Sequence, residues 1–445
     1  MQGYLLALMC VVTMSDFIVG LLDLPAFLRF LPDIMSGVVI VYVVVVGTRN
    51  HFRMLAPKYW LLFGALAVVM LCGIINSGTG SGPIITGMRF YLRAVPMFFL
   101  AAVVPFDESA LKRQLKWLLA VAFIQLPVAG YQRWVVMSEG RFTGDNVRGT
   151  VGDSGVLTMF LVCAVLVLTG LLLKRRISKT WYVILFLLLL VPTTINETKV
   201  TVIFLPLGLL ATLILGAERG KRLRYAGMAF TVLVVFGSIF VPVYDLMEER
   251  NHYKVPILDF FTSEKELDRY LVANQKGQGS GIGEAKLSNR GDSIVIPLGY
   301  LSRDPVNLAF GLGLGNVSPS NLGKNFEGAY FRLFRSVLVT TFAYFALEFG
   351  VLGIMLIGLS YWLIFTDSIA VARQDDGLAG ALAAGWIGVM VVFALATVYN
   401  TFYQFASVTY LYWYFAGVVA ARRVALGYQA AREHHAAAPR VAAEI

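Results

Sequence analysis

Charged residues are scarce in this chain. They make up 14% of its 445 residues, against about 25% in a typical soluble domain. Hydrophobic residues make up 58%, and the mean hydropathy is +0.72. No water-soluble fold can bury that much apolar surface, whereas a bilayer accommodates it as helices of about 20 apolar residues. The composition therefore predicts an all-α polytopic membrane protein.

Cysteine and histidine are also rare. The three cysteines, Cys10, Cys72 and Cys163, each lie inside an apolar run, which argues against a disulfide framework. The four histidines do not recur at metal-ligand spacing, so we expect no metal site and no cofactor. The first apolar run carries Asp16 and lacks a basic leader and a cleavage site, so we expect a first span and not a removable signal peptide.

Apolar runs predict twelve spans, with polar segments between them and a polar tail after the last. The spans are expected near 4–22, 33–47, 59–76, 85–105, 115–137, 154–173, 180–193, 198–217, 225–243, 350–366, 378–399 and 404–421. The apolar segment 336–349 either begins the tenth span or forms an amphipathic helix before it. The predicted organisation is a membrane domain (1–243), a long outer loop containing short helices (244–335), a second membrane domain (336–421) and a basic tail (422–445).

Basic residues cluster in alternate loops between these spans, and the positive-inside rule places such loops in the cytoplasm. The clusters are Arg49, Arg53 and Lys58; Lys112, Arg113 and Lys116; Lys174, Arg175, Arg176 and Lys179; Arg219, Lys221, Arg222 and Arg224; and Arg422 and Arg423. Both termini are therefore expected in the cytoplasm. The long loop, with eleven basic and eleven acidic residues, is expected on the outer face.

Six cations fall at or near the outer face against this rule: Arg89, Arg93, Arg133, Arg141, Arg148 and Lys199. Arginine inside a span costs about 2.5 to 3.5 kcal/mol on insertion scales, so a compensating interaction is expected. An anionic ligand would provide one, because the guanidinium fork matches phosphate oxygens. The alternative is contact with lipid headgroups, or pairing with Glu139, Asp145, Asp153 or Glu197.

Two outer segments are rich in glycine and arginine. Residues 141–155, RFTGDNVRGTVGDSG, can form tight turns whose amides approach an anion. Residues 288–316 contain SNRGDS, then RDP, then GLGLGN; no strand–helix pair surrounds the last motif, so it is not a nucleotide fingerprint. Within this segment, Arg290 either binds a ligand or pairs with Asp292 or Glu284.

The order of these motifs resembles the O-antigen polymerase and O-antigen ligase superfamily. These are bacterial inner-membrane glycosyltransferases that use sugars linked to undecaprenyl diphosphate. The resemblance covers about residues 85–366 and includes RFTG, NETK, the R-G-D to GLGLGN stretch, and LEFGVLGI at the start of the tenth span. It implies a GT-C-like fold, no metal, and a periplasmic site where arginines of two loops hold the diphosphate.

Single residues match the family's motifs unevenly. Arg141 matches the first loop, Arg290 opens the second, and Glu348, Gly350 and Gly353 match its E-x-G-x-x-G pattern. Lys199 stands where the family usually shows a Ser-Arg pair. Ligases usually place a His-Asn pair shortly before the span that follows the loop, and residues 325–335 contain no histidine. That departure favours a polymerase.

The implied reaction is attack by a sugar hydroxyl of one lipid-linked oligosaccharide on the anomeric carbon of another, with loss of undecaprenyl diphosphate. Fixed arginines stabilise the charge that develops on this leaving group. The candidates for that role are Arg290, Arg148 and Arg141, and Glu327, near the position of the ligase histidine, is the candidate general base. The further diphosphate-binding candidates are Arg89, Arg93, Lys199, Arg303, Arg332 and Arg335.

The implied partners are the lipid-linked oligosaccharide as donor and acceptor, membrane lipid, a flippase and a chain-length regulator, and no nucleic acid. Three alternatives stay open. One is a ligase that attaches glycan to lipid A core or protein, and another, disfavoured by the loop pattern, is a shape-determining peptidoglycan polymerase. The third is a lipid-linked glycan transporter, which predicts internal repeats and paired charges at mid-membrane; the sequence shows no repeat.

Overall fold

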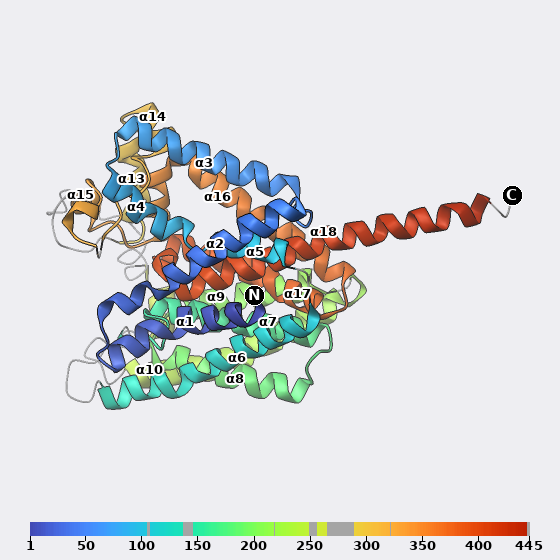
Figure 1. The fold of residues 1–445 in the computed structure, drawn as a ribbon. Helices are drawn as coiled ribbons and strands as arrows, with labels where there is room; N and C mark the ends of the chain where they lie inside the picture. The colour runs from blue at the N-terminus through green and yellow to red at the C-terminus, as the bar shows by residue number, and fades with distance from the viewer. Residues whose placement is uncertain are drawn as a thin grey trace.

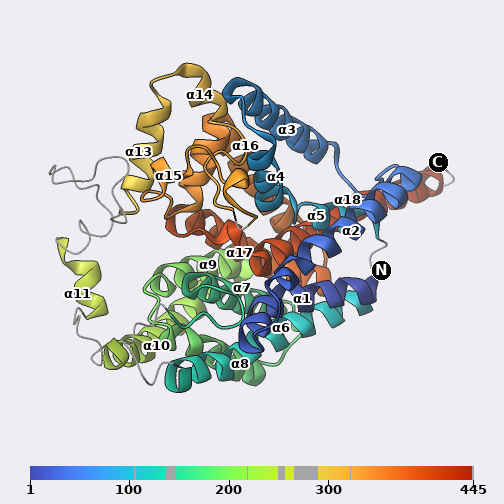
Figure 2. The ribbon, with the colours of Figure 1, turned by 60° about the vertical axis from the view of Figure 1, so that its left-hand side comes forward.

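The computed structural model describes residues 1–104, 107–136, 146–217, 219–248, 256–264, 289–320 and 322–442. Within these ranges every regular element is a helix (Figures 1 and 2). Seven helices are long and apolar enough to cross a membrane, and a bent helix pair makes an eighth candidate. The predicted class, an all-α polytopic membrane protein, is confirmed.

The candidate spans occupy both halves of the chain. The seven long apolar helices are α1 (Gln2–Leu21), α2 (Leu31–Asn50), α3 (Pro57–Ser77), α7 (Ser154–Leu173), α10 (Arg222–Glu248), α16 (Thr341–Gln374) and α17 (Leu378–Tyr399). The bent pair joins α4 (Ser81–Gly87) and the π-helical turn η2 (Met88–Leu92) to α5 (Pro96–Val103) at 46°. Four more helices lie where spans are predicted: α6 (Glu108–Tyr131), α8 (Lys179–Ile195), α9 (Thr201–Leu215) and α18 (Ala406–Ala442).

Only short helices occur in the described part of the segment between α10 and α16. They are α11 (Ile257–Thr262), α13 (Asp292–Leu301), α14 (Pro305–Phe310), the 3-10 turn η6 (Lys324–Phe326) and α15 (Phe331–Phe334). Buried side chains of α13, α15 and the loop between them form a small core with the first turns of α16. The segment is therefore packed onto the membrane helices over residues 289–340.

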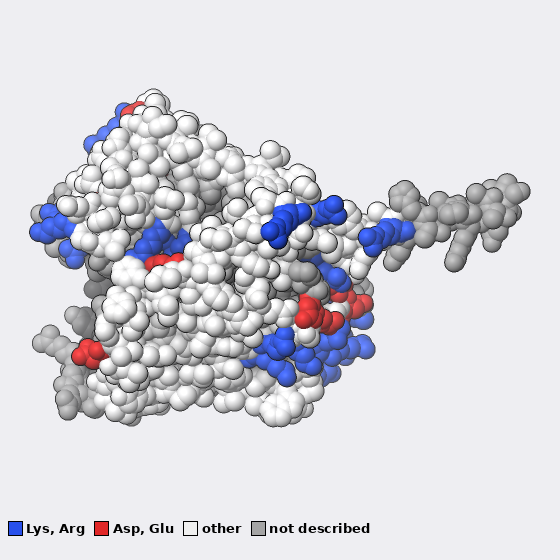
Figure 3. Space-filling model, in the orientation of Figure 1, with Lys and Arg blue, Asp and Glu red and all other residues white. Residues whose placement is uncertain are grey.

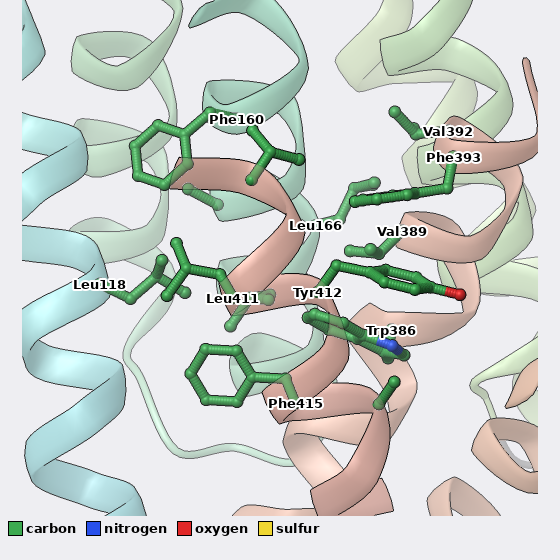
Figure 4. Packing of buried hydrophobic residues seen from close by; sticks show 14 of the residues in the cluster. Leu118, Phe160, Leu166, Trp386, Val389, Val392, Phe393, Leu411, Tyr412 and Phe415 are labelled. Atoms are coloured by element: carbon green, nitrogen blue, oxygen red, sulfur yellow. The ribbon is translucent and has the colours of Figure 1, made fainter. Parts of the chain in front are cut away.

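The helices form two groups on either side of α17 and α18 (Figures 1 and 2). One group contains α3, α13, α14 and α16, and the other contains α6, α7, α8 and α10. Aromatic side chains join the two central helices: Phe393 of α17 stacks on Tyr412 of α18, with ring centroids 4.2 Å apart (Figure 4). The central pair is thus a common wall for both groups.

Helices α7 and α17 are the most buried spans because both are apolar on every side. Asp153 begins α7, where its carboxylate accepts a hydrogen bond of 3.0 Å from the Val156 amide. The two helices approach closely at Gly385 of α17, where an added Cβ would lie 2.5 Å from the Leu166 carbonyl oxygen. Small residues allow such backbone contact between helices in a membrane.

The basic clusters gather at one end of the molecule, where α18 leaves the bundle (Figure 3). Ion pairs join them there to the turn between α16 and α17. Arg422 Nε lies 2.6 Å from Asp375 Oδ2, and Lys174 Nζ lies 2.7 Å from Asp376 Oδ1. Segments far apart in the sequence therefore meet at this end, called the charged end below.

The close approach at Gly385 predicts a stability effect. We expect Gly385→Ala to lower the free energy of unfolding by about 1 to 3 kcal/mol, because the methyl group overpacks the contact between α7 and α17. The measurement is the thermal unfolding midpoint of the detergent-solubilised protein. Gly358→Ala in α16 is the matched control, since nothing lies within 4 Å of its added Cβ. Equal midpoints for the two variants would contradict the packing described here.

Candidate functional site

A cavity of about 670 Å³ lies at the end of the molecule away from the charged end. It is bordered by the last turn of α1, the turn that follows α6 and the start of α18; the opposite ends of α6 and α18 carry basic clusters. Its volume is typical of small-molecule sites. On the face shown in Figure 3, a basic patch with acidic atoms beside it lies in a hollow remote from the charged end.

Four arginines line this cavity: Arg29, Arg89, Arg93 and Arg148. Three of them belong to the six cations that the sequence places against the positive-inside rule, so the structure brings half of that set together. Arg29 was not predicted from the sequence. Its signal is the same as for the other three, because it is a cation in the short predicted outer loop after the first span.

Arg89 of η2 and Arg93, the residue that follows η2, are held by one carboxylate. Arg89 Nε lies 2.7 Å from Asp33 Oδ2, and Arg93 Nη1 lies 3.3 Å from Asp33 Oδ1. Arg93 Nη2 also donates to the Gln404 carbonyl at 2.6 Å, while its buried Nε has no hydrogen-bond partner. Two guanidinium groups share one acid, so positive charge is in excess at this wall of the cavity.

The local backbone explains this pairing. Residues 89 and 93 are four apart in a helical segment, so both side chains leave it on the same face. The π-helical turn η2 and Pro96, at the first position of α5, produce the bend between α4 and α5. The side chain of Asp33, in the first turn of α2, lies across from both arginines and is 19% exposed.

The side chain of Gln132 positions Arg148. Gln132 Oε1 accepts hydrogen bonds from the amides of Arg148 and Gly149, at 3.0 and 2.8 Å. Gly149 has a φ of +58°, which allows the turn that brings both amides to one oxygen. Both amides therefore donate to Gln132, and Arg148 is among the residues that line the cavity. Arg141, from the same predicted loop, lies outside the described residues.

Two other predicted cations have partners away from the cavity lining. Arg133 pairs with Glu197, and the two side chains are 6% and 9% exposed. This is the pairing alternative stated for Arg133 from the sequence. Lys199 Nζ lies 4.2 Å from the centre of the Phe260 ring. Neither residue lines the cavity.

The described part of the long outer segment contributes Pro319 to the cavity lining. Arg303 lies 5.5 Å from the centre of the Tyr300 ring, and Arg335 is exposed. Arg332 Nε lies 2.9 Å from Glu327 Oε1. These residues, including the predicted base Glu327, do not line the cavity.

Arg290 contacts the start of the segment 399–406, whose last residues line one wall of the cavity. Its Nε donates to the Tyr399 carbonyl at 2.9 Å, and its guanidinium carbon lies 4.3 Å from the centre of the Tyr399 ring. The chain continues from Tyr399 to Gln404 and Phe405, which line the cavity. Arg290 thus holds the start of this wall, and the structure does not place it among the lining side chains.

The GLGLGN motif surrounds a buried carboxylate. Glu348 Oε2 accepts from the Gly315 amide at 2.7 Å, and Oε1 accepts from the Val317 amide and the Ser318 hydroxyl, at 3.1 and 2.7 Å. The amides of this turn are therefore occupied by the protein's own acid. An added Cβ on Gly315, which has a φ of +84°, would lie 1.8 Å from the Pro83 carbonyl oxygen in α4.

This turn connects α16 to the arginines of the cavity. Gly350, two residues after Glu348, has a φ of +64° and breaks α16, which begins at Thr341. Of the apolar segment 336–349, residues 341–349 form the part of α16 that precedes this break. Glu348 positions the glycine turn against α4, and α4 continues directly into η2 with Arg89. Glu348 and Gly350 of the E-x-G pattern therefore shape the segments next to the cavity, and neither residue lines it.

Among the described lining residues of the cavity, one is a carboxylate, Asp16 of α1. Asp33 is not in the lining and contacts it through Arg89 and Arg93. From the sequence, Asp16 is a charge within the first predicted span. Its placement makes it a better candidate than Glu327 for a group that accepts a proton from a ligand in this cavity.

Searched against known protein families, the chain matches none, and it matches no protein of curated function. What the site can do is therefore inferred from its residues. The described lining includes four arginines, the carboxylate of Asp16 and Tyr131, and Asp33 is paired with two of the arginines. That combination suits a ligand with a multiply charged anionic part and hydroxyl groups.

We expect Glu348→Gln to lower the free energy of unfolding by about 2 kcal/mol or more, because its amide nitrogen must face backbone donors. The thermal unfolding midpoint in detergent measures this effect. Glu327→Gln is the matched control: Arg332 is 72% exposed, and an exposed ion pair contributes about 0 to 1 kcal/mol. A smaller loss for Glu348→Gln than for Glu327→Gln would show that Glu348 does not support the turn.

Proposed function

We propose that this chain is a glycosyltransferase that polymerises undecaprenyl-diphosphate-linked oligosaccharide units into a surface or exo-polysaccharide. The observation that carries the proposal is the cavity lined by Arg29, Arg89, Arg93 and Arg148 at the end away from the charged end. Under the positive-inside rule, the charged end is cytoplasmic and the cavity periplasmic. The motif resemblance supplies the substrate class, and the arginine cavity supports it.

The proposal includes twelve passes in a GT-C-like arrangement, with both termini in the cytoplasm. Helix ends support this count, because contacts alternate between the two ends of the molecule along the chain. Contacts at the charged end are Gln2 with Asp107, Lys58 with Asp367, Lys174 with Asp376 and Arg422 with Asp375. Contacts at the cavity end are Ser77 with Asn316, Gln132 with Gly149, Asn196 with Ser154 and Thr341 with Asn400.

In the proposed reaction the leaving diphosphate lies against Arg89 and Arg93. Both side chains are already oriented by Asp33, so little reorganisation is needed when charge develops on the diphosphate. Arg29 and Arg148, from other walls of the cavity, supply further positive charge. Asp33 offsets the repulsion between Arg89 and Arg93 before the substrate binds.

Asp16 is proposed as the general base. An acceptor hydroxyl transfers its proton to the Asp16 carboxylate while its oxygen forms a bond to the anomeric carbon of the donor. The bond between that carbon and the diphosphate oxygen breaks, and its electron pair stays on the leaving diphosphate. The proton then passes from Asp16 to water, which restores the carboxylate.

We expect the double variant Arg89→Ala/Arg93→Ala to lower polymer formation about 100-fold or more, because it removes the charges that face the leaving group. The measurement is the product ladder formed from purified lipid-linked units by the protein in nanodiscs. Lys324→Ala, an exposed cation of the outer segment, is the control. Polymer formation at the level of Lys324→Ala would remove Arg89 and Arg93 from the site.

Asp16→Asn is expected to lower kcat about 100- to 10,000-fold, with binding of the donor retained, because the amide cannot accept the proton. The nanodisc assay gives kcat, and retention of radiolabelled donor gives binding. Asp16→Glu should restore part of the rate, since it keeps a carboxylate. A full rate in Asp16→Asn would exclude this residue as the base.

The phenotype of a deletion strain separates the polymerase from its alternatives. We expect single repeat units on the anchor, because units would still cross the membrane and be attached. Full-length polymer that does not reach its anchor would indicate a ligase. Lipid-linked units retained on the cytoplasmic side would indicate a transporter. Either of the last two results would overturn the proposed polymerase.

A further inference from the structure

The helical segment that carries Arg89 and Arg93 is interrupted directly beside them. The π-helical turn η2 ends at Leu92 and α5 begins at Pro96, with a bend of 46° between the two helices. Proline has no amide hydrogen, so Pro96 cannot donate to the carbonyls of the preceding turn. The interruption therefore frees backbone carbonyls at the point from which the two arginines project.

The first freed carbonyl is that of Arg93 itself. In a regular α-helix it would accept from the Met97 amide, but that amide donates to the Ala94 carbonyl at 3.1 Å. The hydroxyl of Ser36, in α2, donates to the Arg93 carbonyl at 2.5 Å. Ser36 is 2% exposed, so this hydrogen bond is shielded from water.

The second freed carbonyl is that of Tyr91. In the π-helical pattern of η2 its donor would come from position 96, five residues on, where the proline has no amide hydrogen. The Tyr403 hydroxyl donates to this carbonyl at 3.2 Å, from the 3-10 turn η7 (Phe402–Gln404) between α17 and α18. Two hydroxyls from distant parts of the chain therefore stand in for helical donors at the interruption.

The same two elements also hold the Arg93 side chain. Asp33 is three residues before Ser36 and so on the same face of α2, and its Oδ1 lies 3.3 Å from Arg93 Nη1. Gln404 follows Tyr403, and its carbonyl accepts from Arg93 Nη2 at 2.6 Å. Helix α2 and turn η7 thus each bind both the guanidinium and the interrupted backbone, which fixes the two relative to each other.

We propose that Ser36 and Tyr403 are positioning residues for the arginines that hold the leaving diphosphate. Neither residue lines the arginine cavity, so they act by fixing the backbone that carries Arg89 and Arg93. The inference rests on the proposed function. Preorganised cations stabilise developing charge because they need not move during the reaction, so a looser backbone affects the transition state more than the bound substrate. The two hydroxyls therefore act on kcat and hardly on KM.

The test compares Ser36→Ala and Tyr403→Phe with the wild type in the nanodisc polymerisation assay. We expect each variant to lower kcat about tenfold and to change the KM for the lipid-linked unit less than about twofold. In the Arg89→Ala/Arg93→Ala background, the same changes should lower the rate less than about twofold further, because the hydroxyls act through these arginines.

Ser368→Ala in α16 and Tyr414→Phe in α18 are the matched controls. Both residues are buried; the Ser368 hydroxyl donates to the Ile364 carbonyl at 2.7 Å, and the Tyr414 hydroxyl to Gln114 Oε1 at 3.0 Å. Neither residue lines the arginine cavity, so we expect kcat within about twofold of the wild type. Thermal unfolding midpoints compare the stability of all four variants. Should the serine test variant fail to fold, the tyrosine test variant, which keeps its ring, carries the test.

Inorganic pyrophosphate gives a readout that needs no turnover. It shares the diphosphate charge of the leaving group, and its affinity for the detergent-solubilised full chain is measured by isothermal titration calorimetry. We expect Tyr403→Phe to weaken this binding about fivefold or more, with no change in Tyr414→Phe, because the charge is held by the arginines that Tyr403 positions.

The outcomes separate the positioning role from the proposed function. A wild-type kcat in Tyr403→Phe, an equal loss in its control, or no binding of pyrophosphate to the wild type would each overturn the positioning role. Pyrophosphate binding that depends on Tyr403, with no polymer formed by the wild type, would overturn the glycosyltransferase instead and leave Tyr403 as a positioning residue of an anion site.

Discussion

Three backbone carbonyls around the connection between α17 and α18 join segments from the whole chain. The Tyr399 oxygen accepts from Arg290, the Asn400 oxygen accepts from the Thr341 amide and hydroxyl, and the Gln404 oxygen accepts from Arg93. The last carbonyls of a helix have no partner within it and carry partial negative charge, so they attract cations and free amides. The end of α17 thereby fixes the outer segment and the start of α16, and Gln404, in the turn that follows, holds one arginine of the cavity.

That arrangement explains why distant sequence motifs converge on one site. Arg93 lines the cavity and Arg290 does not, but both donate to backbone carbonyls of the same short connection, those of Gln404 and Tyr399. The glycine turn, held by Glu348, supports α4 and so fixes η2 from the other side. Hydrogen bonds between side chains and backbone groups therefore fix the position of this cavity wall. The arginine side chains project from the wall into the cavity lining.

The helical class and three of the four arginines that line the cavity, Arg89, Arg93 and Arg148, could be predicted from the sequence because both depend on strong local signals. Helices α7 and α17 are apolar on all sides. A cation outside a predicted cytoplasmic loop is easily recognised, because it departs from the positive-inside rule. The role of Asp33 could not be predicted, since an acid in the first turn of a span is common and its two partners lie 56 and 60 residues away. For Arg133 the sequence offered four acidic partners, and the choice of Glu197 among them depends on how the ends of α6 and α8 approach each other.

The rim of the arginine cavity contains apolar side chains that face outward. Leu21 lines the cavity and is 54% exposed, and nearby Leu22 and Phe27 are 61% and 66% exposed. For a substrate that keeps its isoprenoid tail in the bilayer, such a rim permits approach from the side. Under the proposed function, encounter is then a search in two dimensions, and the rate would follow the surface density of lipid-linked units and the fluidity of the leaflet.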